Sequence, residues 1–179
     1  IEGLATRLGA IELAQAAHAD DLLRTLAQDD DVSVALAAVA ALSAPDATLA
    51  LAVFERARKS ESYAARAGAI NVAPRTIGKE AALPYYRELT NDPNPVVRLT
   101  AARQLAHAGG SAGGVKADAE LATTIFAAVL EGSADFDNRL SAAVDLAALH
   151  DSRGLQALSK FTTERALTAD ERAAAAAAH

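Results

Sequence analysis

The chain has 179 residues, a formal net charge of −6 and no cysteine. These values exclude disulfides and thiolate metal sites, and they disfavour nucleic-acid binding, which needs a basic surface against the phosphates. Hydrophobic residues make up 51 % of the chain but aromatic residues only 4 %, so a core of Ala, Leu, Val and Ile between closely packed helices is predicted. Charged or polar residues interrupt every apolar segment, so we expect a soluble chain without a membrane span. No feature of the sequence indicates a compartment.

The hydrophobic pattern predicts one array of antiparallel helix pairs that covers the whole chain, 1–179. Equivalent positions recur roughly 28 to 41 residues apart, which is the period of a helical repeat protein. The predicted divisions are a partial unit at 1–18 and units at about 20–43, 46–73, 76–109, 117–150 and 152–179. The chain begins inside a second-helix pattern and ends in an alanine run, so we expect it to be part of a longer protein.

Acidic residues and proline mark the predicted helix boundaries in the first half of the chain. Asp20 is placed where an N-cap favours a new helix. The acidic run 29–31 is interpreted as a capped turn, because it lacks the spaced ligands of a calcium loop. A helix that begins at Tyr63 is expected to end near Asn71, because Pro74 opposes its continuation.

The unit before the glycine-rich segment 109–114 has the clearest local signals. Its second helix is predicted to have Asn94 as N-cap and Pro95 as its first residue. The glycine-rich segment itself predicts a surface linker. Near the end of the chain, Thr168 and Glu171 form a capping box that predicts a last helix.

A short motif in this unit carries a resemblance to a known family. The residues of this motif are Pro84, Asp92, Val97, Arg98, Ala101, Ala102 and Leu105. With them the chain resembles the HEAT-like repeats, particularly the bacterial type associated with phycobilisome lyase proteins, which implies an all-α, α-solenoid fold of stacked helix pairs.

The same resemblance implies a structural role for a row of arginines. In HEAT-like proteins the turn Asp and the second-helix Arg typically form a ladder that joins neighbouring units, and Asp92 with Arg98 has that spacing of six. Ala35 stands where an arginine is expected, so the ladder should be interrupted there. The equivalent ladder positions elsewhere are Arg7, Arg66 and Arg139.

The leading functional hypothesis is a non-enzymatic scaffold whose inner face, lined by second helices, binds another protein or another domain of its own chain. The alternative implied by the resemblance is an accessory subunit or domain of a cofactor-handling enzyme, either lyase-like or redox. DNA binding, as in alkylpurine glycosylases, is disfavoured by the negative charge and the lack of Trp. Helical phase gives the candidate contact residues Thr100, Arg103, His107, Ser141, Val144 and Asp145. Tyr86 is a further candidate, because one ring of the adjacent Tyr85 and Tyr86 is expected to face outward.

No catalytic, cofactor or metal motif stands out. The sequence offers no Ser-His-Asp arrangement or phosphate loop with a specific spacing. Its four histidines are separated by whole repeats and have no metal-ligand spacing, so a favourable interaction with helix C-termini is their predicted role. These histidines are His18, His107, His150 and His179.

Overall fold

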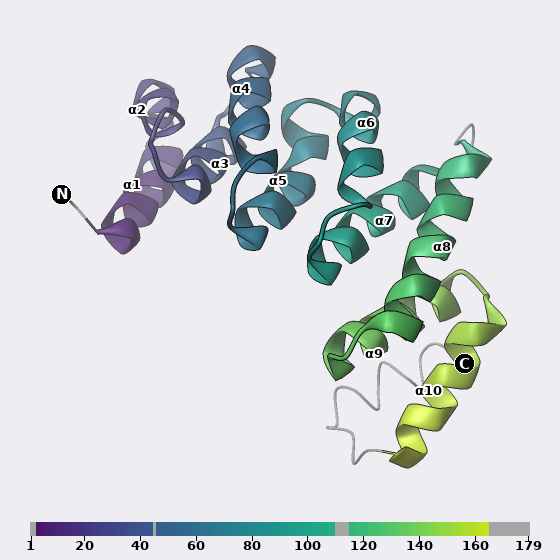
Figure 1. Cartoon of the computed structure of the whole chain (residues 1–179). Helices are drawn as coiled ribbons and strands as arrows, with labels where there is room; N and C mark the ends of the chain where they lie inside the picture. Colours follow the sequence, from purple (N-terminus) through teal and green to yellow (C-terminus); the bar gives the residue numbers. More distant parts are fainter. Residues whose placement is uncertain (1–2, 45, 110–114, 165–179) are drawn as a thin grey trace. The chain divides into compact units, whose positions relative to one another are not determined.

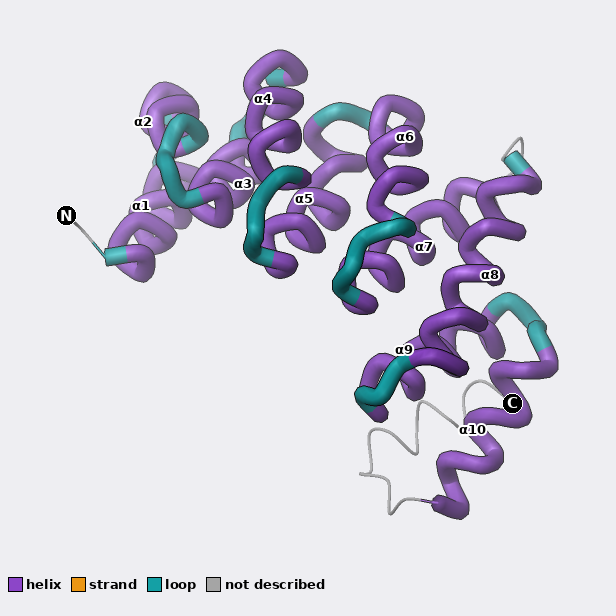
Figure 2. Tube along the Cα trace, in the orientation of Figure 1, coloured by secondary structure: helices purple, strands orange, loops and turns teal. Residues whose placement is uncertain are grey.

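The computed structural model describes residues 3–44, 46–109 and 115–164. Every regular element in these ranges is an α-helix (Figure 1), so the predicted all-α, helical-repeat solenoid is confirmed. Contacts divide the chain into two compact units, 1–86 and 87–179. Figure 2 shows that short loops connect most successive helices. In the described residues no helix has both the length and the apolar character needed to cross a membrane.

The first unit is built from two layers of helices. The helices α2 and α4 form one layer and α1, α3 and α5 the other (Figure 1), with α3 in contact with all four of the others. Its largest fully buried side chains are Leu23, Val34, Val53 and Ile70. The helices are α1 (Leu4–Ala16), α2 (Asp20–Leu26), α3 (Val32–Ala41), α4 (Ala47–Arg58) and α5 (Tyr63–Thr76). They are followed by α6 (Lys79–Leu89).

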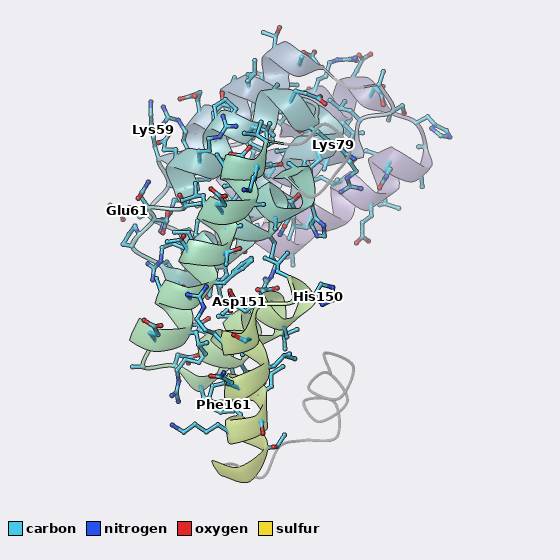
Figure 3. The ribbon with its side chains drawn as sticks, turned by 90° about the vertical axis from the view of Figure 1, so that its right-hand side faces the viewer. Lys59, Glu61, Lys79, His150, Asp151 and Phe161 are labelled. Atoms are coloured by element: carbon cyan, nitrogen blue, oxygen red, sulfur yellow. The ribbon has the colours of Figure 1, made fainter. Side chains whose placement is uncertain are left out.

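In the second unit each helix from α7 to α10 packs on the next one along the chain, and α7 also contacts α9. Phe126 and Leu146 are fully buried within it, and Phe161 of α10 lies 5.2 Å from Phe136, measured between ring centroids. Figure 3 shows Phe161 on α10. The helices are α7 (Pro95–Gly109), α8 (Lys116–Gly132), α9 (Phe136–Ala148) and α10 (Ser152–Glu164).

Local capping explains most of the helix starts. The carboxylate of Asp31 accepts a hydrogen bond from the Ser33 N–H at 2.9 Å, and Asn94 Oδ1 accepts one from the Val96 N–H at 2.9 Å, as predicted for a cap. The prediction for Asp20 was wrong in detail. The N-cap of α2 is Ala19, so Asp20 lies in the first turn of the helix.

Helix α5 extends further than predicted. It continues past Asn71 and contains Pro74, ending at Thr76. Proline has no N–H to donate to the carbonyl four residues earlier, which here belongs to Ile70. The hydroxyl of Tyr86 donates to that carbonyl at 3.4 Å instead, so the helix tolerates its proline.

Two helices of the described region, α1 and α9, are followed two residues later by a histidine in the left-handed conformation. His18 has φ 52° and His150 has φ 58°. After α9, the N–H of Asp151 donates to Leu146 O at 3.0 Å, which closes the helix end. Figure 3 shows His150 and Asp151 in this turn before α10. The segment 110–114, the capping box at Thr168 and the terminal His179 lie outside the described residues.

Candidate functional site

The candidate contact residues of the second unit lie on two adjacent helices, and the structure brings three of them together. Arg103 of α7 binds the carboxylate of Asp145 on α9, with its Nε at 3.0 Å from Oδ1 and 2.9 Å from Oδ2. Its Nη2 lies 2.8 Å from Oδ2 and also donates to Ser141 Oγ. The candidates are therefore bound to one another and link the two helices. We call the surface of α7 and α9 that carries Thr100, Arg103, His107, Ser141 and Asp145 the α7–α9 face.

The ion pair on this face is partly shielded from water. The side chain of Asp145 is 17 % exposed and that of Arg103 is 37 % exposed. Burial raises the pKa of Asp145 above its ordinary value, although the hydrogen bond and charge of Arg103, and more weakly the charge of His107, lower it. Desolvation therefore outweighs the charge pairing at this carboxylate.

A pocket of about 240 Å³ opens beside the ion pair. Arg103, Asp145 and His107 contribute its polar part, and Phe126 of α8 contributes a buried aromatic ring. Its remaining lining residues are Ala106, Ala148 and Leu149. The pocket therefore combines a charge-paired wall with apolar walls, all within the second unit.

The other candidates differ in how accessible they are. His107 is exposed, whereas Thr100 is half-buried and donates its hydroxyl to Val96 O at 2.7 Å. Val144 is also half-buried and packs against the core cluster between α9 and α10. His107 is thus the candidate that most clearly faces solvent.

Tyr86 does not occupy the surface position expected of a contact residue. It is only 2 % exposed, and its hydroxyl is used by the Ile70 carbonyl. Burial raises the pKa of Tyr86 to about 12. Of the two adjacent tyrosines, Tyr85 is half-buried and Tyr86 is the one that packs in the core.

Arg98 and Arg66, two of the arginines assigned to the ladder, bind the turn of their own repeat. Arg98 Nη1 donates to Asp92 O at 2.8 Å and to Pro93 O at 3.0 Å. Arg66 Nη1 makes the same pair of contacts, to the carbonyls of Ser60 at 2.7 Å and of Glu61 at 3.1 Å. In the repeats of Arg66 and Arg98 the guanidinium thus binds the two carbonyls six and five residues earlier in the chain. Arg98 thus binds the carbonyl of Asp92, while the Asp92 carboxylate accepts a hydrogen bond from the Asn94 N–H at 2.8 Å.

A different arginine fills the gap left by Ala35. Arg56 of α4 donates from Nη2 to the carbonyls of Asp29 at 2.5 Å and Asp30 at 3.2 Å. These carbonyls are six and five residues before Ala35, so they correspond to those held by Arg66 and Arg98. The carboxylate of Asp29 accepts a hydrogen bond from Arg7 Nη1 at 2.6 Å, which connects α1 to the turn between α2 and α3.

The recurring turn geometry agrees with a comparison against protein families. Residues 50–124 match the family model described as HEAT repeats. The match supports a HEAT-like repeat family for this chain, and the phycobilisome-lyase type stays a prediction. HEAT repeats commonly serve as protein-interaction scaffolds. No curated protein and no solved structure matches the chain.

Arg139 is the ladder position that departs most from this HEAT-like turn. Its guanidinium carbon lies 5.8 Å from the ring centroid of Phe136 and 5.7 Å from that of Phe161. Its Nε is buried without a hydrogen-bond partner. Contact with two aromatic faces gives a guanidinium a favourable electrostatic environment, so Arg139 links α9 to α10.

Sequence reasoning missed one strong pair, between α6 and α8. Arg87 donates to Asp118 from Nε to Oδ1 at 2.7 Å and from Nη2 to Oδ2 at 2.8 Å. Asp118 is only 3 % exposed and lies in the first turn of α8, where a negative charge interacts favourably with the helix dipole. The two residues are 31 positions apart, and no local motif connects them.

The polar side chains form no recognisable metal site within the described residues. No group of three or more His, Cys, Asp or Glu side chains there is arranged to hold a metal ion. The acidic run at the turn before α3 is occupied by its own hydrogen bonds, because Asp29 Oδ1 accepts from the Asp31 N–H at 2.8 Å. The α7–α9 face, with its pocket, is therefore the candidate functional site.

Proposed function

We propose that the protein is a non-enzymatic scaffold that binds a protein, or another domain of its own chain, on the α7–α9 face. The observation that carries this proposal is the pocket beside the Arg103–Asp145 pair. A recessed apolar site with a polar border is the usual form of an anchor point for a partner side chain.

The contacts beneath this face favour recognition by a preformed surface. Arg103 uses Nε and Nη2 to hold α7 against α9 through Asp145 and Ser141. A guanidinium held in this way has already lost its rotamer freedom, so less entropy is lost when a partner binds. The HEAT-like repeat, commonly a protein-interaction scaffold, agrees with this function.

Site-specific photo-crosslinking in cells that make the protein tests the assignment of the face. A photoreactive amino acid would replace His107 or Thr100 on the α7–α9 face, and in matched controls Thr124 or Ala128, which are exposed on α8. We expect a common crosslinked product from the first two positions and none from the controls. Crosslinks from the α8 positions alone, or from none of the four, would refute the proposed binding face.

A further inference from the structure

We infer that the pocket between the C-terminal parts of α7 and α9 receives one uncharged apolar side chain, of leucine or phenylalanine size, from a partner protein. This inference rests on the proposed function and specifies the chemistry of its contact. Three features of the pocket support it: its walls, its charge balance and its size.

The walls offer apolar contact at the depth where an anchor side chain would sit. Phe126 is 1 % exposed and forms part of the lining, while Leu149 is 38 % exposed and is one of the large apolar residues left open to water. The two alanines, Ala106 and Ala148, leave space between them. An occupant would remove apolar area from water mainly at Leu149 and the two alanines, which is the main source of affinity at such a contact, and would gain van der Waals contact with the buried Phe126 ring.

Arg103 and Asp145 compensate each other's charge, so a charged occupant would have to compete with this ion pair. Both carboxylate oxygens of Asp145 already accept from Arg103. A basic side chain would have to displace that guanidinium, and an acidic one would meet the buried carboxylate. Transfer of an unpaired charge into such a site is costly, whereas a neutral side chain leaves the pair intact.

The size of the pocket matches one side chain better than a larger ligand. Its volume of about 240 Å³ is below the roughly 300–1,000 Å³ typical of small-molecule sites. A single large apolar residue that enters a pocket with a polar border is the usual arrangement of an interface hot spot. His107 is the exposed polar residue at this border.

Methyl NMR with minimal probes tests the inference on the full chain. The probes are the N-acetyl, N-methylamide forms of leucine, phenylalanine, glycine, arginine and glutamate, titrated to tens of millimolar against protein with labelled alanine methyl groups. We expect the leucine and phenylalanine forms to shift the Ala106 and Ala148 methyl signals and to bind about tenfold more tightly than the glycine form, or better. The arginine and glutamate forms should bind no better than glycine.

A filled pocket provides the specificity control. Ala148→Leu places a side chain at the exposed wall of the pocket, and Ala128→Leu makes the same change at an exposed position of α8 outside it. The leucine probe should lose its effect on Ala106 in the first variant and keep it in the second. Binding that survives Ala148→Leu, or tighter binding of a charged probe, would overturn the inference.

The two experiments separate the two proposals. If leucine and phenylalanine fail to bind while His107 and Thr100 still crosslink to a partner, the occupant is wrong but the binding face stands. If only the α8 positions crosslink, the proposed function fails whatever the probes do. Probe binding that Ala148→Leu abolishes, together with loss of the crosslinked partner in that variant, supports both proposals.

Discussion

Replacement of Gly154 by alanine should weaken the packing of α10 on α9. A Cβ at this position would lie 2.4 Å from the Ala147 nitrogen, 2.6 Å from the Ala143 carbonyl oxygen and 2.8 Å from Leu146 Cβ. The first two of these atoms belong to the backbone of α9, so no side-chain rotation can relieve the contact. Since nonbonded heavy atoms pack at about 3.5 Å or more, the two helices must separate by about 1 Å.

The magnitude follows from the packing that this separation disturbs. Leu158 and Phe161 of α10 are buried against α9, and a gap of 0.5–1 Å forfeits about a quarter to a half of the dispersion energy at each contact. Overpacking of this kind costs up to about 3 kcal/mol, and the better helix propensity of alanine returns about 1 kcal/mol. We therefore expect Gly154→Ala to destabilise the α9–α10 contact by about 2 kcal/mol.

A second glycine provides a matched control for the same chemical change. Gly68 lies within α5, and a Cβ there would have Leu36 Cδ1 as its nearest neighbour outside its own helix backbone, at 3.7 Å. This is ordinary van der Waals contact, so Gly68→Ala should stabilise the protein by about 0.5–1 kcal/mol. The two substitutions are thus expected to have opposite signs.

Amide hydrogen exchange measures the effect where it occurs, because parts of a repeat protein can open independently. In Gly154→Ala the amides of α10 should lose about 30-fold in protection, which corresponds to 2 kcal/mol, while those of α3 and α5 remain unchanged. Urea unfolding followed by circular dichroism should show Gly68→Ala more stable than the parent. Unchanged protection of α10, or a shift of the same sign for both variants, would refute the packing argument.

Three further predictions test the turn, the ion pair and the helix end. Arg56→Ala should lower the free energy of unfolding by about 1 kcal/mol through the loss of two carbonyl contacts, and Arg56→Lys should not restore it in urea titrations, because an ammonium lacks the planar fork. The Asp145 carboxyl should titrate above its ordinary pKa of 3.8 in carbon-detected NMR, and Arg103→Ala should raise the pKa further. Because the pKa of Asp145 is raised in the folded state, its contribution to folding stability is present below pH 3.8 and is lost as the pH rises through the folded-state pKa. A titration midpoint of Asp145 at or below 3.8 would contradict the role of burial. His150→Gly should raise stability by about 0.5 kcal/mol and His150→Val should lower it by about 1 kcal/mol or more, since φ is 58° there; the reverse order in thermal melts would contradict a strained helix end.

The parts of the fold that depend on neighbouring residues could be predicted from the sequence. The cap at Asn94 is an example, because a side chain and an N–H two residues away decide it. The continuation of α5 could not be predicted in the same way. It depends on a hydroxyl 16 residues away, that of Tyr86, which satisfies the carbonyl freed by Pro74.

The candidate site shows the same division. Helical phase predicted outward positions on the second helices for Arg103, Ser141 and Asp145, since phase is a property of each helix alone. It did not show that these residues bind one another, because Arg103 and Asp145 are 42 positions apart and the register between α7 and α9 decides which side chains meet. The pocket has the same origin, since α8 adds the buried ring of Phe126 to it.

The turn before α3 shows why an absent motif residue does not establish an absent interaction. Ala35 predicted an interruption, yet the carbonyls of Asp29 and Asp30 still bind a guanidinium. A buried or partly buried carbonyl needs a donor, and any arginine whose side chain reaches the turn can supply it. Here Arg56 reaches it from the following helix, 27 positions away from Asp29. Within the described residues, the two carbonyls of a turn are therefore held by the second-helix arginine in the repeats of Arg66 and Arg98, and by Arg56 of the following helix in the repeat that has Ala35.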